Sequence, residues 1–241
     1  MGENTKKILL HGIELLQQTD KDIAALLAPR HDQIISHLNT YINEIKLFND
    51  AYGLVAVKSD EELVVKHILD SLAPLGIISR LAAKAANNAA CNAALHALPQ
   101  IADAGSGAGL PGIPLAIALP QYHFTLIERM ERRADFLWNA KAVLGLSNIT
   151  IEKEELEKIR TGQFSLVTFR AFKPLEPKLL AALFNICTEQ GIIAAYKGRH
   201  EKIMEEIAPL EKLCKWKALP CNVPLLNEER HLLVIEPQSS P

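Results

Sequence analysis

The sequence contains little cysteine and none of the spacings that cysteine chemistry uses. Four cysteines occur in 241 residues, and none forms a Cys-x-x-Cys pair or stands at a metal-ligand spacing from a histidine. They are Cys91, Cys187, Cys214 and Cys221. Neither a disulfide framework nor a zinc site is therefore expected, and we predict that the protein binds no metal.

Long apolar runs and N-terminal targeting signals are also missing. No run approaches the roughly 18 apolar residues that a membrane-spanning helix needs. The first residues, MGENTKKILLHGIELLQQ, lack the apolar centre of a secretory signal. Lys6 stands where a myristoylation signal requires Ser or Thr. The sequence therefore predicts a soluble cytoplasmic protein.

An excess of charge of either sign is absent too, because the formal net charge at pH 7 is −2. This excludes a uniformly basic surface for nucleic acid, but it allows a local basic patch, since a folded surface can segregate its charges. Hydrophobic residues make up 49% of the chain and charged residues 22%, so a substantial core can form. The length suits one large α/β domain with a small extension.

The first hundred residues have helical periodicity. Apolar side chains recur at spacings of four and three, which places them on one face of a helix. They are Ile34, Leu38, Tyr41, Ile45 and Phe48. A second helix is expected to begin at Ser59 or Asp60. Its buried residues are expected to be Val64, Ile68, Leu72 and Leu75.

An alanine- and asparagine-rich insert follows these helices. Residues 81–99 hold nine alanines and three asparagines, which offer little apolar bulk for packing. We expect this insert, over about residues 79–99, to be a peripheral helical flap. The sequence thus predicts an N-terminal helical extension over residues 1–99, followed by a second unit over residues 100–241.

From Gln100 onwards, short apolar segments alternate with helical patterns. The expected strands are Ile101–Ala104, Phe124–Glu128, Ile149–Glu152, Leu166–Phe169 and Ile192–Tyr196. The expected helices are Ile113–Ala118, Arg132–Leu144, Pro174–Cys187 and His200–Leu210, with a short turn near Leu156. Such alternation predicts a parallel sheet with helices on both faces.

Two further strands are expected at the end of the chain, over Leu213–Leu219 and His231–Glu236. Their connection is too short for a parallel crossover, so they must form an antiparallel hairpin. The predicted fold is α/β and Rossmann-like, with a mixed, mostly parallel sheet, a terminal antiparallel hairpin and the N-terminal helical extension.

The stretch IADAGSGAGLPGIPLAIAL contains a glycine-rich turn between a strand and a helix. Glycine is needed where the backbone adopts positive φ or approaches a ligand closely. In an open parallel sheet, ligands bind at the carboxyl ends of the strands. We therefore predict that Asp103, Gly105, Gly107 and Gly109 belong to a cofactor site.

Two acidic residues help to choose the cofactor. Asp103 would repel a pyrophosphate, whereas S-adenosylmethionine (SAM) carries a sulfonium and an ammonium that favour an acid. Glu128 ends the next strand and can accept hydrogen bonds from both ribose hydroxyls of an adenosyl group. Gly107-x-Gly109-x-x-Gly112 also matches the dinucleotide fingerprint, so a nicotinamide-linked oxidoreductase remains an alternative. The acidic pair and the terminal hairpin favour SAM.

Basic residues follow several strands at the presumed ligand edge. Arg170 ends the fourth strand, and a site role is expected because arginine is almost never fully buried unpaired. The other cations at this edge are expected to contact RNA phosphates. They are Lys173, Lys197, Arg199 and Arg230.

An ordered set of short motifs resembles the small-subunit ribosomal RNA methyltransferase G family, also called glucose-inhibited division protein B. The family block D-x-G-[ST]-G-x-G-[FL]-P-G-[IL]-P-L is complete over Asp103–Leu115. The block [KR]-H-[IL]-x-D-S is matched by Lys66–Ser71, and the terminal E-R-H by Glu229–His231. The family's S-R-A is similar to Phe169–Ala171, with Phe169 in place of Ser.

This resemblance implies methylation of N7 of one guanine in the decoding-site loop of small-subunit (16S) ribosomal RNA, with SAM as the methyl donor. It also implies cofactor contacts from Gly105, Leu110, Leu156, Glu157 and Arg170. His67 lies in the matched Lys66–Ser71 block, so it joins the RNA-binding candidates.

The expected reaction needs no protein nucleophile or base. Guanine N7 is an unprotonated lone pair, so catalysis should rest on proximity, orientation and charge placement. The sequence has no convincing Ser/His/Asp or Cys/His arrangement, and we predict no catalytic residue. A catalytically silent ribosome-assembly factor that binds RNA without turnover remains the other alternative.

Overall fold

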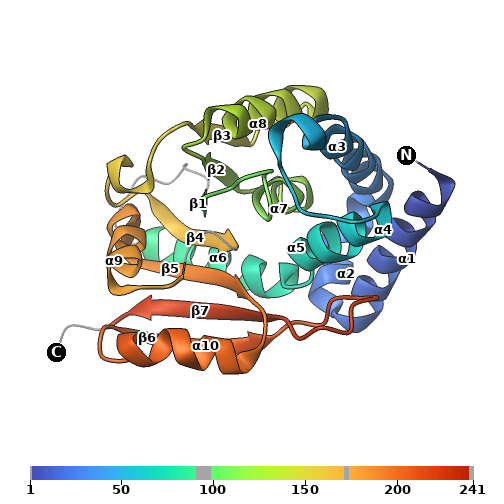
Figure 1. The fold of residues 1–241 in the computed structure, drawn as a ribbon. Coiled ribbons are helices and arrows are strands. Elements are labelled where there is room, and N and C mark those ends of the chain that lie inside the picture. The colour runs from blue at the N-terminus through green and yellow to red at the C-terminus, as the bar shows by residue number, and fades with distance from the viewer. Residues whose placement is uncertain (1, 91–98, 171–173, 239–241) are drawn as a thin grey trace.

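The computed structural model describes residues 2–90, 99–170 and 174–238 (Figure 1). Helices occupy the first part of the chain, as the periodicity predicts. They are α1 (Glu3–Thr19), α2 (Lys21–Leu27), η1 (Ala28–Arg30), α3 (His31–Tyr52), α4 (Asp60–Leu63), η2 (Val64–Leu69), α5 (Asp70–Leu72) and α6 (Leu75–Ala90). The Ser59 hydroxyl caps α4 by accepting a hydrogen bond from the Glu62 N–H at 3.1 Å, which confirms the predicted helix start.

The sheet has seven strands in the order β3-β2-β1-β4-β5-β7-β6. They are β1 (Gln100–Ala104), β2 (His123–Ile127), β3 (Ile149–Glu152), β4 (Phe164–Arg170), β5 (Cys187–Lys197), β6 (Cys214–Pro220) and β7 (His231–Pro237). The first five are parallel, while β7 pairs antiparallel with both β5 and β6. The predicted parallel sheet with a terminal antiparallel hairpin is confirmed. The hairpin strand β6 forms one edge of the sheet, and β3 forms the other.

Two buried clusters cover the two faces of the sheet. The helices that connect the strands are α7 (Gly112–Ala118), α8 (Glu131–Leu144), η3 (Leu156–Lys158), α9 (Pro177–Ile186), α10 (His200–Ile207) and η4 (Ala208–Leu210). One cluster joins α1, α3, α6, α7 and α8 to one face, and the other joins α9 and α10 to the opposite face. Ile101 and Ala102 of β1 belong to different clusters, because neighbouring strand residues point to opposite faces.

The alanine-rich insert is not peripheral where it is described. Ala82 and Ala85 are buried at 0% and 3% exposure, and their helix α6 packs against β4 and β5. The expectation failed because small side chains allow a helix to approach a sheet closely, so low bulk does not mean low contact. Residues 91–98 of the insert lie outside the described residues.

Strand β5 is longer than the apolar pattern predicts. It begins at Cys187, directly after α9 ends at Ile186, whereas we expected the strand to begin at Ile192. Its first residues include polar Glu189 and Gln190, which hide the strand from a hydrophobicity argument. Among the described residues, no helix is both long and apolar enough to cross a membrane.

Candidate functional site

The glycine-rich turn after β1 adopts the backbone conformations that its sequence predicts. Gly105, Gly107 and Gly109 have φ values of +67°, +59° and +90°. Gly112 is needed for a different reason, because a Cβ there would lie 2.4 Å from Cδ2 of Leu126 and 2.8 Å from Oδ2 of Asp103. The turn therefore combines left-handed backbone with close packing of α7 on the sheet.

Asp103 supports this turn from inside the protein. It is fully buried, and its Oδ2 accepts hydrogen bonds from the Ser106 hydroxyl at 2.6 Å and from the Gly112 N–H at 3.0 Å. The Thr168 hydroxyl donates to Oδ1 at 3.2 Å. Burial raises the pKa of Asp103 to about 6, although these hydrogen bonds oppose the rise. Asp103 was predicted to face a cationic ligand, whereas its buried carboxylate supports the turn, a role that the motif did not predict.

Glu128, which directly follows β2, also holds this turn. Its Oε2 accepts a hydrogen bond from the Gly107 N–H at 2.9 Å, and its Oε1 accepts one from the Met130 N–H at 2.8 Å. A carboxylate has about four acceptor positions, so two remain for a ligand. Two ribose hydroxyls would match that remaining capacity. The geometry of Glu128 thus fits the adenosyl group that it is predicted to bind.

A cleft of about 620 Å³ lies beside this turn, and we call it the glycine-loop cleft. It is lined by Tyr52, Gly105, Ile127, Glu128, Arg129, Met130, Glu131, Arg132, Arg133, Glu154 and Leu156. Its predicted members Gly105, Glu128 and Leu156 come from the carboxyl-end loops of β1, β2 and β3. The cleft therefore lies at the ligand edge of the parallel strands.

Five other predicted cofactor residues line neither this cleft nor the one described next, namely Asp103, Gly107, Gly109, Leu110 and Glu157. Leu110 is 5% exposed and belongs to the hydrophobic core, while Glu157 is exposed on η3. Their cofactor contacts remain predictions. Sequence reasoning also missed Tyr41 of α3, whose buried hydroxyl donates to the Ala108 carbonyl within the turn at 2.6 Å. Tyr41 was predicted only to be a core residue, because it lies on the apolar face of the expected helix.

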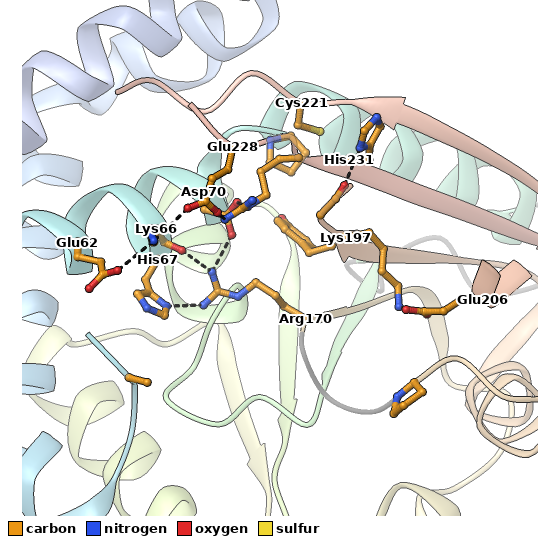
Figure 2. Close-up of a pocket in the computed structure, with 16 residues that line it drawn as sticks. Glu62, Lys66, His67, Asp70, Arg170, Lys197, Glu206, Cys221, Glu228 and His231 are labelled. Carbon is orange, nitrogen blue, oxygen red and sulfur yellow. Dashed lines mark hydrogen bonds and ion pairs between the residues drawn. The ribbon is translucent and has the colours of Figure 1, made fainter. Parts of the chain in front are cut away.

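A second cleft, of about 850 Å³, opens at the ends of β4 and β5 (Figure 2). We call it the arginine cleft. It is lined by Ala56, Glu62, Lys66, His67, Asp70, Pro74, Arg170, Pro174, Tyr196, Lys197, Gly198, Glu206, Cys221, Glu228, Arg230 and His231. Arg230 reaches it because β7 is antiparallel, so the start of β7 lies beside the end of β5, with His231 opposite Lys197. Four predicted site residues, His67, Arg170, Lys197 and Arg230, are brought together here.

Asp70 is the centre of the ion pairs in the arginine cleft. Its side chain is only 7% exposed. Nη1 of Arg170 donates to its Oδ2 at 2.8 Å, and Nε of Arg230 donates to its Oδ1 at 3.1 Å. One carboxylate thus joins the helical extension to the last residue of β4 and to the residue that precedes β7. Asp70 lies within the matched Lys66–Ser71 block, but it was not predicted to be a site residue.

His67 is neutral and held in place by Arg170. Its Nδ1 lies 3.0 Å from Nη2 of Arg170. Because the guanidinium can only donate, Nδ1 is the acceptor. Burial, followed by the nearby Arg170 charge, lowers the pKa of His67 to about 4. His67 and Lys66 lie on η2, a π-helical turn, a conformation that is frequent at functional sites.

The predicted RNA-binding lysines and arginines differ in their surroundings. Lys197 is 12% exposed and forms an ion pair with Glu206, and its Nζ lies 5.6 Å from the centroid of the Phe169 ring. Arg199 is exposed at the start of α10, outside the residues that line the two clefts. Lys173 lies outside the described residues. Their contacts with RNA remain predictions.

The chemistry of the two clefts is complementary. The glycine-loop cleft presents the acceptor capacity of Glu128, whereas the arginine cleft presents cationic donors. Of the five guanidinium N–H groups of Arg170, three are used by Lys66, Asp70 and His67 among the described residues, so two remain.

Cys221 also lines the arginine cleft, but burial raises the pKa of its thiol to about 12, which disfavours a nucleophilic thiolate.

The chain is similar to known proteins over nearly its whole length. A family model described as rRNA small subunit methyltransferase G (GidB) matches residues 34–233. The ribosomal RNA small subunit methyltransferase G of Treponema denticola is 40% identical, over 95% of this chain and 93% of its own length. The protein of the same name from Nitrosococcus oceani is 34% identical, over 99% of this chain and 96% of its own length.

The fold is similar to that of solved methyltransferases. The crystal structure of a SAM-dependent methyltransferase from Aquifex aeolicus matches with a TM-score of 0.51 and 14% sequence identity. The match covers 80% of this chain and 97% of the Aquifex chain. The predicted Rossmann-like methyltransferase fold is confirmed.

Proposed function

Because this chain belongs to the rRNA small subunit methyltransferase G family, it is a SAM-dependent methyltransferase, and we propose that it methylates N7 of one guanine in the decoding-site loop of 16S ribosomal RNA. The observation that carries the proposal is the pair of clefts at one edge of the sheet. The glycine loop follows β1 and Arg170 ends β4, and these two strands are neighbours. A cofactor and an acceptor base would thus meet where the strand order reverses.

The glycine-loop cleft is the proposed cofactor side. Bound SAM supplies a methyl group on a positively charged sulfur. Glu128 would accept the ribose hydroxyls with its two remaining acceptor positions, while its bonds to Gly107 and Met130 hold the carboxylate in place. Asp103 keeps Gly112 and Ser106 in position, so the turn does not have to be ordered when the cofactor binds. Preorganisation of this kind reduces the entropic cost of binding.

The arginine cleft is the proposed acceptor side. Its cations suit a polyanion, and RNA that reaches it would place a base beside the strand end that carries Arg170. The two N–H groups of Arg170 that have no partner among the described residues can donate to an acceptor such as guanine O6 or a phosphate oxygen. His67, neutral and bonded to Arg170, would orient that guanidinium and would not remove a proton. The proposed chemistry needs no base, because guanine N7 carries no proton at neutral pH.

The test is to incubate the protein with labelled SAM and 16S RNA and to map the methylated positions. We expect one guanine to carry the label as 7-methylguanine, detected by strand cleavage after reduction and aniline treatment. Label on a ribose oxygen or an exocyclic amine would contradict the N7 assignment while leaving methyl transfer intact. RNA binding without any incorporation would instead support the silent assembly factor.

A further inference from the structure

Arg230 is paired with two carboxylates that differ in their access to water. Asp70 accepts from Nε of Arg230 and is 7% exposed, whereas Glu228 lies 2.9 Å from Nη2 of Arg230 and is 52% exposed. The other oxygen of Glu228 lies 3.1 Å from Nζ of Lys66 on η2. Figure 2 shows Glu228 and Lys66 facing one another beside Asp70. Glu228 therefore bridges two cations that come from distant parts of the chain.

The two carboxylates should respond differently to an incoming anion. Asp70 is buried among its partners, and removing it would leave desolvated cations without a counterion. Glu228 is half exposed, and ion pairs in such a setting contribute little because water competes for both charges. The contact of Glu228 with Lys66 and Arg230 is therefore weak enough to be exchanged. Lys66 would also keep its second partner, Glu62, at 3.0 Å.

We propose that Lys66 and Arg230 form a binding site for one phosphate group of the RNA backbone, and that the Glu228 carboxylate occupies this site in the free protein. The inference rests on the proposed function, since it takes the arginine cleft as the RNA side. It adds Lys66 to the RNA-binding residues and gives Glu228 a role as an internal competitor for the phosphate.

The geometry of the bridge supports a phosphate as the ligand. One oxygen of Glu228 contacts Lys66 and the other contacts Arg230. A phosphodiester also has two charged oxygens, so it can contact the same two cations in the same arrangement. Asp70 holds Arg230 in place from the buried side during this exchange, so the guanidinium does not lose its orientation.

The first experiment compares Glu228→Gln with Glu229→Gln. Both substitutions remove one negative charge from adjacent positions, but the Glu229 carboxylate accepts from the His200 N–H and pairs with neither cation of the proposed site. The Glu229 backbone carbonyl accepts from Nη1 of Arg230, and Glu229→Gln leaves this carbonyl in place. Binding of a 16S RNA fragment with the decoding-site loop is measured by titration at several salt concentrations. Glu228→Gln should bind about threefold to tenfold more tightly, the range expected when one or two weak ion pairs no longer compete. Glu229→Gln should change the affinity by less than about twofold.

The second experiment removes the cation. Lys66→Gln should weaken RNA binding and reduce the dependence of log affinity on log salt by about one unit, as expected for one lost phosphate contact. In the Lys66→Gln background, the gain from Glu228→Gln should shrink, because one of the two competing contacts is already absent. Thermal unfolding of each variant shows that the comparison is made between folded proteins.

Three outcomes would overturn the proposal. Equal gains from Glu228→Gln and Glu229→Gln would indicate a general charge effect, and an unchanged affinity of Lys66→Gln would remove the phosphate site. Weaker binding of Glu228→Gln would mean that Glu228 itself recognises the RNA. None of these results depends on methylation of the guanine by the wild-type protein, so failure of the proposed function would be seen separately in the methylation map.

Discussion

The glycine-loop cleft and the arginine cleft lie at the same edge of the sheet but are built in opposite ways. The first relies largely on residues that are near in the chain, because Asp103 and Glu128 bind backbone N–H groups within 21 positions of themselves. Tyr41 and Thr168 add two hydrogen bonds from more distant positions. The second is formed by side chains that are 100 or more residues apart, as in the pairs of Asp70 with Arg170 and Arg230. Hydrogen bonds between residues that are near in the chain form the glycine turn, so a sequence motif can predict it. The ion pairs of the arginine cleft form only when the N-terminal helices dock onto the sheet.

The largest expected effect follows from breaking the distant network. Asp70→Asn keeps the shape of the side chain but leaves Arg170 and Arg230 without their shared buried charge. We expect a loss of about 3–5 kcal/mol in the free energy of unfolding, the range for breaking a buried ion pair. Denaturant unfolding measures this loss.

The matched control is Asp60→Asn in the same helical extension. Asp60 pairs with Lys46 near the surface and is 39% exposed, so its loss should cost less than about 1 kcal/mol. Equal losses in the two variants would show that the Asp70 network is no more important to the fold than an exposed ion pair.

A smaller effect is expected at the local site, and it should appear in binding. Glu128→Ala should weaken SAM by about 1.5–3 kcal/mol, the range for hydrogen bonds to a charged group. Calorimetric titration with SAM provides the measurement, and affinity for the RNA fragment should stay within about twofold. Glu154→Ala removes another carboxylate from the same cleft and serves as the control, with little expected change. Unchanged SAM affinity in folded Glu128→Ala would remove Glu128 from the cofactor site.

Acid should destabilise the arginine cleft through His67. Its folded-state pKa, about 4, lies below the unfolded value of 6.5, so its contribution to stability is present above pH 6.5 and is lost as the pH falls towards 4. From pH 7 to pH 5 this loss amounts to about 2 kcal/mol. Asp103, whose pKa is raised to about 6, acts in the opposite direction in the same range.

The difference between wild type and His67→Asn isolates the His67 contribution, because Asp103 is common to both proteins. Wild type should lose about 2 kcal/mol more than His67→Asn between pH 7 and pH 5, measured by denaturant unfolding at each pH. A parallel decline of the two proteins would mean that His67 is not held neutral by its surroundings.

The smallest expected effect is on the chemical step. From about pH 7 to 8.5, single-turnover methyl transfer should be nearly independent of pH, because the reaction has no essential general base. The pKa values of His67, about 4, and of Asp103, about 6, both lie below this range. His67→Asn should lower the rate through the orientation of Arg170 without changing the shape of the profile. A fall in rate towards the acidic end of this range that disappears in His67→Asn would assign the role of base to this residue.

Sequence reasoning succeeded where a short segment determines its own conformation. The glycine turn, the parallel strands and the antiparallel hairpin were all predicted, because glycine placement, apolar periodicity and connection length act over few residues. It failed for α6, which packs on the sheet although its composition indicated a peripheral flap. It also treated Tyr41 as simple core, because periodicity does not show what a buried hydroxyl contacts.

By itself, the sequence determined the family, the fold and the position of the glycine turn, since these depend on motifs and patterns that are continuous in the chain. Only the tertiary structure decided that Asp70 joins Arg170 to Arg230, that His67 is neutral and that Glu228 bridges Lys66 and Arg230. The physical reason is that ion pairing and desolvation depend on distance in space. In this protein, those distances are set by the docking of the N-terminal helices onto the sheet.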